Sequence, residues 1–424
     1  MKVESEAMQD SEIKAESGKT QNTVHTHAWL KQRGLAKRSP GLPTGATRAW
    51  LKQRGLAKRS PDLPAGATRA WLLVLTPVAL LILMLAKGNP DLAERFFAMG
   101  FYRVASPLIS RATALLPFSL LEFGIIALII LLIVFLTIFI RKVVKNRGSR
   151  KSIILKTGLN ALCIASTVFF VFTVLCGVNY HRHPFSYYSG LSVQPSGIDE
   201  LNSLCLELAA EANALYPQVV GEGGAIMYGG HAETSRAAQS AMRSLGERYP
   251  VLAGYYPPVK PVLFSGFMSR TQITGIYSPF TMEANVNTAC TKYTIPATMC
   301  HELSHLRGFM REDEANFIAY LACMESDDPA LRFSGTMLAL VYSGNQLYSR
   351  QELYKALTET YSDGVKQAFI DDYIYWEQFD NTVISTVSSA VNDTYLKANS
   401  QADGVASYGR MVDLLLAYRR GAAS

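Results

Sequence analysis

Long apolar runs crowd one part of the chain, positions 71–178, and the remaining sequence mixes apolar and polar residues as globular domains do. Residues 71–86 and 158–178 contain no charged side chain, and residues 120–140 contain only Glu122, near the start of the run. Each run approaches the roughly 20 residues that a helix needs to cross the hydrocarbon core of a bilayer. The pattern predicts three transmembrane helices.

Basic residues flank these runs unequally. The segment before the first run, residues 28–70, carries ten Lys and Arg, and the loop at 141–156 carries seven, whereas the loop at 87–119 carries four. Lys and Arg accumulate in the cytoplasmic loops of membrane proteins. We therefore expect the N-terminus and the second loop in the cytoplasm, and everything after Asn179 outside it.

The first 70 residues show no hydrophobic periodicity. Residues 1–27 are polar and are expected to be disordered, and residues 28–69 repeat one 21-residue unit twice, almost without change. Two copies are too few for a solenoid, so the repeat is interpreted as a duplicated basic segment beside the membrane; alternatively, its Trp-containing units bind anionic lipid headgroups. Because the basic clusters behind the formal charge of +7 lie beside apolar runs, they predict membrane lipids rather than nucleic acid as partners.

The residues after the third run, 180–424, are enough for a domain with its own core. Four leucines at three- and four-residue spacing mark one face of a helix that starts near Ser196: Leu201, Leu204, Leu208 and Leu215. Short strands are predicted at 262–264 and 273–277, and helical patterns dominate from Pro296 onward. These signals predict an α+β domain that is mainly helical.

The expected organisation is a disordered basic region (1–70), a three-helix transmembrane region (71–179) and an extracytoplasmic domain (180–424). The six cysteines form no CxxC pair, which argues against a structural zinc ribbon. A bridge between Cys290 and Cys300 stays open if the domain faces an oxidising compartment.

The segment His301-Glu302-Leu303-Ser304-His305 carries the clearest chemical signal. On a helix the two histidines lie one turn apart on the same face, so both imidazoles can bind one metal ion. Glu302 lies beside them, where it can act as general base toward a zinc-activated water. The pattern predicts a zinc hydrolase site with one Zn²⁺ per chain.

A catalytic zinc needs a third protein ligand, and the acidic cluster that follows supplies two candidates. Glu312 and Asn316 are again four residues apart, so Glu312 can bind the metal while Asn316 holds a ligating histidine in place; Glu314 is the competing ligand. A carboxylate from a second helix is the gluzincin arrangement. The metzincin alternative needs a histidine six positions after His305, where the chain has Arg311. The alternative without chemistry is a solvated, charged turn after a helix.

Two further segments concern the substrate. Residues 275–287 alternate like a strand just before the motif, and in zinc peptidases of this general class an edge strand there pairs with the extended substrate. A phenol or a guanidinium could stabilise the oxyanion of a tetrahedral intermediate. The candidates are Tyr408 and Arg410, with Tyr320 and Tyr342 as alternatives.

The three apolar runs, together with residues 277–287, 300–308 and 311–317, resemble a bacterial membrane family catalogued as domain-of-unknown-function family 3810. That family looks like a branch of the gluzincin metallopeptidases, and the resemblance extends over residues 71–415. The resemblance implies a gluzincin-like zincin domain, with a small sheet and an HExxH helix, in a multi-pass protein of the bacterial cell membrane. The Glu-x-x-Ala-Asn spacing from Glu312 is also similar to the Glu-x-x-Ala-Asp of CAAX-prenyl membrane proteases, in which the first Glu is the third ligand.

These observations predict a membrane-anchored zinc metallopeptidase that acts on a peptide or protein substrate. His301, His305 and Glu312 would hold the metal, and Glu302 would be the general base. One alternative enzyme is a zinc amidase that acts on cell-wall peptides; the alternative from another class is a zinc-binding membrane sensor or scaffold without turnover. The sequence does not indicate an oligomeric state or a cleavage specificity.

Overall fold

The computed structural model describes residues 67–424 except 222–225, 227–228, 400, 402–409 and 424. All but the last four residues of the basic region predicted at 1–70 lie outside the described residues, as does Tyr408. From Gly66 onward the chain forms one compact unit, in which helices predominate and the sheet is small.

Three helices are long and apolar enough to cross a membrane, as the hydropathy pattern predicted. They are α3 (Leu75–Gly88) with the 3-10 turn η1 (Ala67–Val74) before it, α6 (Leu120–Lys145) and α7 (Arg150–Leu175). The third helix begins at Arg150 rather than at residue 158. The hydropathy pattern does not include residues 150–157 because they contain basic side chains. These side chains are compatible with a helix, so the helical backbone extends beyond the apolar run.

The segment between the first two spans, expected to be a loop, is helical. It comprises α4 (Pro90–Leu92), the π-helical η2 (Ala93–Tyr102) and α5 (Arg103–Thr113). Its polar side chains bind the domain, since the Ser106 hydroxyl donates to the Leu306 carbonyl at 3.0 Å. The buried face of these helices contains small polar residues such as Ser106 and Ser110. A search for periodic apolar residues does not detect a face of this composition.

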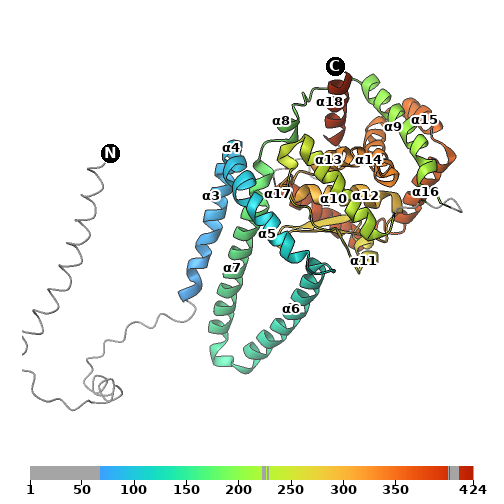
Figure 1. Ribbon diagram of the computed structural model, residues 1–424. Coiled ribbons are helices and arrows are strands. Elements are labelled where there is room, and N and C mark those ends of the chain that lie inside the picture. Colours follow the sequence, from blue (N-terminus) through green and yellow to red (C-terminus); the bar gives the residue numbers. More distant parts are fainter. Residues whose placement is uncertain (1–66, 222–225, 227–228, 400, 402–409, 424) are drawn as a thin grey trace, which may run out of the picture. The chain divides into compact units, whose positions relative to one another are not determined.

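The domain core is built from helices that pack in pairs, α9 with α14 and α12 with α13 (Figure 1). The predicted leucine face lies on α9, where all four leucines are buried. The helix predicted from Pro296 onward is confirmed as α12 to α18. The helices of the domain are α8 (Phe185–Ser189), α9 (Ile198–Val219), α10 (His231–Arg248), α11 (Ser265–Arg270), α12 (Ile295–His305), α13 (Glu312–Met324), α14 (Pro329–Leu347), α15 (Gln351–Glu359), α16 (Asp363–Glu377), α17 (Val383–Ala398) and α18 (Met411–Ala423).

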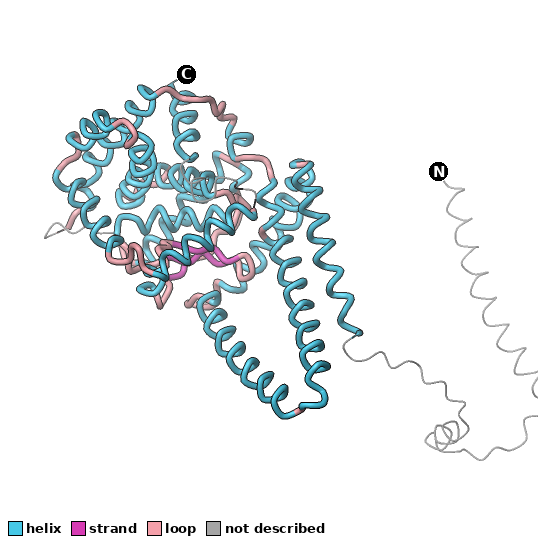
Figure 2. Tube along the Cα trace, turned by 180° about the vertical axis from the view of Figure 1, so that it is seen from behind, coloured by secondary structure: helices cyan, strands magenta, loops and turns pink. Residues whose placement is uncertain are grey.

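One three-stranded sheet lies beside α12, and Figure 2 shows its strands among the helices. The order is β1-β3-β2, with β1 parallel and β2 antiparallel to β3. The bounds are β1 (Lys260–Pro261), β2 (Gly275–Ser278) and β3 (Glu283–Val286). The strand predicted at 273–277 is confirmed as β2, which is an edge strand. The strand predicted at 262–264 is wrong: only Val262 bonds to β3, while Leu263 and Phe264 leave the sheet and are exposed.

A buried polar network joins α6 to this sheet. The Glu283 carboxylate, on β3, accepts from the backbone N–H groups of Leu120 and Leu121 at 3.0 Å each and pairs with Lys260. A negative charge there is favoured by the helix N-terminus. The Glu122 carboxylate, in the first turn of α6, accepts hydrogen bonds from the backbone N–H groups of Leu263 and Phe264, just before α11. The sheet is therefore fixed to the first turn of a membrane-spanning helix.

All six cysteines are free thiols. The Cys290–Cys300 bridge that the sequence left open is absent; Cys300 instead lies 4.0 Å, sulfur to sulfur, from Cys323 in the core between α12 and α13.

Candidate metal centre

The helix that carries the motif is short and has clear ends. Pro296 occupies the first turn of α12, where a missing N–H costs nothing. The helix ends at His305, and the chain reverses at Gly308, whose φ of 80° is a conformation that favours glycine. This reversal brings the Phe309 carbonyl back to His305 and lets α13 begin at Glu312, beside the histidines.

Three side chains bring one ligand atom each to a common point. The ligand atoms of His301, His305 and Glu312 all lie within 4.8 Å of one another. Nε2 of His301 lies 3.2 Å from Nε2 of His305 and 3.1 Å from one Glu312 oxygen, while the other oxygen lies 4.0 Å from His305 Nε2. Ligands of a tetrahedral zinc, at about 2.0–2.1 Å from the ion, are separated by about 3.3 Å. Two of the three separations lie close to this value and the third is longer, so the donor set fits a single zinc ion after a small shift of Glu312.

Both imidazoles are held by their other ring nitrogen. His301 Nδ1 lies 2.7 Å from Oδ1 of Asn316, and His305 Nδ1 lies 2.7 Å from the Phe309 carbonyl. Both partners are acceptors, so each Nδ1 carries a proton and each Nε2 is the ring nitrogen left for a metal, on the side of Glu312. The Asn316 side chain thus lies behind the His301 ring, and the role of His301 as a metal ligand stays a prediction.

The two imidazoles have opposite electrostatics. Burial opposes the charge on His301, but the hydrogen bond and negative charge of Glu312 outweigh it and raise its pKa to about 9. Burial lowers the pKa of His305 to about 4, against the attraction of Glu312. One positive charge is thus preferred between the two rings. A metal cation at this point would take the place of the His301 proton.

Glu302 lies beside the cluster in a dry environment. It is buried, and this burial raises the pKa of its carboxyl group to about 8; the positive charge of His301 and a hydrogen bond from the Tyr277 backbone act in the opposite direction. Edge strand β2 passes directly over it, because a Cβ atom at Gly275 would overlap the Glu302 carboxylate and the Thr298 methyl group. Only glycine allows this approach.

The remaining predicted residues lie in other surroundings. Glu314, the competing ligand, is held by Arg311 at 2.6 Å and by the backbone N–H of Phe185 at 2.7 Å, so Glu312 is the acidic residue of the cluster. Arg410 pairs with Asp313 at 3.2 Å, on the first turn of α13.

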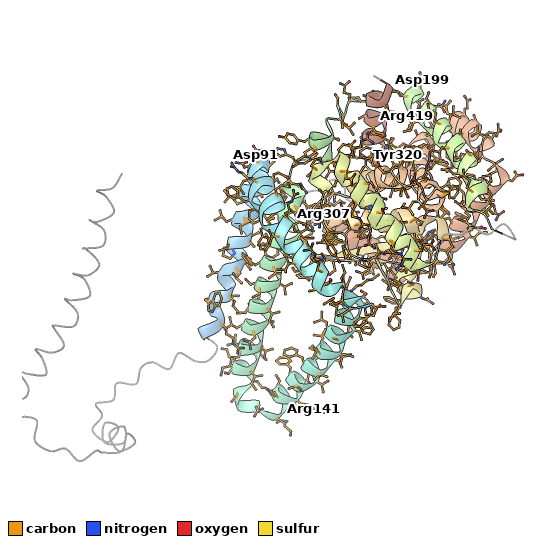
Figure 3. All side chains as sticks on the ribbon, in the orientation of Figure 1. Asp91, Arg141, Asp199, Arg307, Tyr320 and Arg419 are labelled. Carbon is orange, nitrogen blue, oxygen red and sulfur yellow. The ribbon has the colours of Figure 1, made fainter. Side chains whose placement is uncertain are left out.

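The alternative tyrosines differ from each other. Burial raises the pKa of Tyr342; a hydrogen bond with the Asn316 side chain opposes this rise, and the charge of Glu312 adds to it. Burial raises the pKa of Tyr320, labelled in Figure 3, and the charges of Glu211 and Tyr418, rather than that of Glu312, add to this rise. Any role of Arg410, Tyr320 or Tyr342 in stabilising an oxyanion stays a prediction.

Several tyrosines near the cluster were not assigned a role from the sequence. The Tyr277 ring lies 5.7 Å from the His305 ring, and the Tyr102 hydroxyl donates to the His305 carbonyl at 2.8 Å. Tyr180, just after α7, donates to the Tyr395 hydroxyl at 3.1 Å. Burial, with the charge of Glu312 adding to it, raises the pKa of Tyr180 and of Tyr395, so both phenols stay protonated. These residues come from four separate segments, and no local spacing could have grouped them.

The comparison with known proteins gives a family but no activity. A family model described as a protein of unknown function, DUF3810, matches residues 97–416. The chain belongs to this family. The match includes α6, α7, the sheet and all the residues of the cluster, and it confirms the family that the sequence resembled. No curated protein and no solved structure matches this DUF3810 member.

Proposed function

We propose that this DUF3810 protein is a membrane-anchored, zinc-dependent hydrolase whose substrates are peptides. The observation that carries the proposal is the convergence of His301, His305 and Glu312 within 4.8 Å, with both Nε2 atoms turned toward the carboxylate. Two histidines and one glutamate are the ligand set of one class of catalytic zinc site, which leaves a position for a water or a substrate. The ordered hydrogen bonds behind both rings support this reading.

Glu302 supplies the acid–base chemistry of the proposal. When bound, zinc would supply Lewis-acid chemistry, lowering the pKa of a coordinated water and polarising a carbonyl group. The Glu302 carboxylate would accept a proton from the attacking water and pass it to the leaving amine. Burial raises the pKa of Glu302 to about 8 in the metal-free protein, and a zinc ion beside it would lower this pKa toward the range of a general base.

Strand β2 supports a peptide as the substrate. It is one of the two edge strands of the sheet, and the backbone of its residue Tyr277 donates a hydrogen bond to Glu302. An extended peptide added to this edge would lie next to the general base, with its backbone groups paired to the strand. An amide from a cell-wall peptide would use the same residues, so it remains an alternative substrate of the same proposal.

The test is hydrolysis of a mixed peptide library by the full chain reconstituted in vesicles. We expect the parent protein to cleave peptides and the Glu302→Gln variant not to cleave them. Removal of the metal with a chelator should abolish cleavage by the parent protein, and added zinc should restore it. Gln keeps the size of Glu302 but cannot accept the proton. Zinc binding without cleavage of peptides or cell-wall amides would favour a sensor or scaffold. The buried Glu302 argues against that outcome, because a structural site has no use for a base.

A further inference from the structure

Six large apolar side chains near α11 and on α17 are exposed, each over more than half of its surface. They are Leu263 (65%), Phe264 (60%), Phe267 (61%), Val383 (81%), Val387 (57%) and Val391 (63%), hereafter the apolar patch. The two elements touch, because the Ser388 hydroxyl on α17 donates to the Thr271 carbonyl at the end of α11 at 2.9 Å. Gathered exposed apolar side chains mark an interaction site.

Helix α17 is amphipathic with its apolar face turned outward. Val383, Val387 and Val391 are four residues apart and form one stripe, and a shallow groove beside it is lined by Val387, Ala390, Val391 and Thr394. The only charged residues of this helix, Asp393 and Lys397, pair with each other at 2.7 Å. A helix in a water-facing position would have the opposite arrangement.

One end of the apolar patch lies at the start of a membrane span. Glu122, in the first turn of α6, accepts from the backbone N–H groups of Leu263 and Phe264 at 3.0 and 2.7 Å. Since α6 enters the bilayer from Leu120, these two side chains are held at the level at which the apolar span begins.

The other end of α17 lies at the end of a second span. The Tyr395 ring contacts the ring of Phe172, in the last turn of α7, with 6.2 Å between centroids, and its hydroxyl bonds to Tyr180. Figures 1 and 2 both show α6 and α7 meeting at their turn and diverging toward the domain. The elements that carry the apolar patch therefore connect the domain ends of the two diverging spans.

We propose that the apolar patch is inserted in the lipid leaflet next to the domain, with α17 lying as an interfacial helix between the ends of α6 and α7. A bilayer crossed by both helices is already present at this level, so lipid is the occupant that the position requires. Exposed Arg270, at the end of α11, would meet the phosphate groups at the same level. The inference does not depend on zinc or on catalysis.

Site-directed labelling of the full chain in phosphatidylcholine–phosphatidylglycerol vesicles tests this placement. Val387→Cys and Phe267→Cys carry a polarity-sensitive fluorophore within the apolar patch. The control is Val193→Cys, an exposed valine (46%) in the loop before α9. Figure 3 shows Asp199, in the first turn of α9, on the side of the domain that faces away from Arg141 and the spans. All native cysteines are buried, so the added thiol is the one that reacts.

We expect lipids with a nitroxide near the headgroup to quench the labels at 387 and 267 several-fold more than the label at 193, and aqueous iodide to show the reverse order. Labels at 387 and 267 that respond to iodide as the control does would overturn the proposal, because the patch would then face water. Protection from both quenchers would overturn it as well, since a protein or a second copy would cover the patch. Phe267 and Val387 lie on different elements, so local misfolding at one leaves the other informative.

Discussion

Asn316 offers a sharp test of how the proposed ligands are oriented. Its Oδ1 lies 2.7 Å from His301 Nδ1, and the side chain is only 4% exposed. Asn316→Ala removes the acceptor, so the Nδ1–H group is left unpaired in a dry site or the ring turns and its Nε2 leaves the metal. Loss of such a supporting partner costs about 10- to 100-fold in metal affinity, or about 1.4–2.7 kcal/mol.

The assay is zinc affinity by competition with a chromogenic chelator, measured on the full chain in detergent. Asn316→Asp retains an acceptor and should bind zinc at least as tightly as the parent protein, because a carboxylate makes the ring more basic. The matched control is Asn287→Ala: Asn287 is buried but bonds to Ser269 and the Ile273 carbonyl, so stability should fall while zinc affinity stays. Equal zinc affinity in Asn316→Ala and the parent would refute the reasoning.

Three further results are expected. Zinc affinity should rise about tenfold per pH unit between pH 6 and 8, because the metal must displace the proton from His301, whose pKa without metal is about 9. Chelator competition across this pH range measures the affinity, and an affinity that does not change with pH would contradict the prediction. Gly275→Ala should lower the stability by about 1–3 kcal/mol and should also lower the rate of hydrolysis, while the zinc content stays the same. The control is Gly266→Ala, whose added Cβ meets nothing within 4 Å and which should change neither the stability nor the rate of hydrolysis. Lys260→Met should destabilise by about 3–5 kcal/mol in denaturant melts because Glu283 stays buried without its cation. A loss no larger than that of Arg332→Met, which breaks the partly exposed pair with Glu211 and should cost up to about 1 kcal/mol, would show that the junction contributes little.

The candidate site was largely predictable because its residues are close in sequence. His301, His305, Glu312 and Asn316 lie within sixteen positions, and the helical period alone places the members of each pair on one face. The tyrosines around them were not predictable. Tyr102 bonds to the His305 carbonyl from a distant segment, and Tyr180 and Tyr395 lie where the charge of Glu312 adds to the rise of their pKa. This tertiary packing is recorded in no local pattern.

Errors in the predicted fold have a common physical origin, which is the assumption that apolar residues are covered by protein. Leu263 and Phe264 were assigned to a strand because they are apolar, yet the structure exposes both beside the start of α6. Conversely, the helices at 90–113 bury serines and were taken for a loop. Both errors lie at the junction of the spans and the domain. The rule that apolar residues are buried and polar residues exposed, which holds for soluble proteins, does not hold there.

The central claim is that the three converging side chains hold zinc, and metal analysis of the purified full chain tests it most directly. We predict about one zinc per chain in the parent protein and in Glu302→Gln, and a loss of zinc in His301→Ala, since His301 is a ligand and Glu302 is not. A parent protein that is folded and binds no zinc, or a His301→Ala variant that binds as much zinc as the parent, would contradict the account.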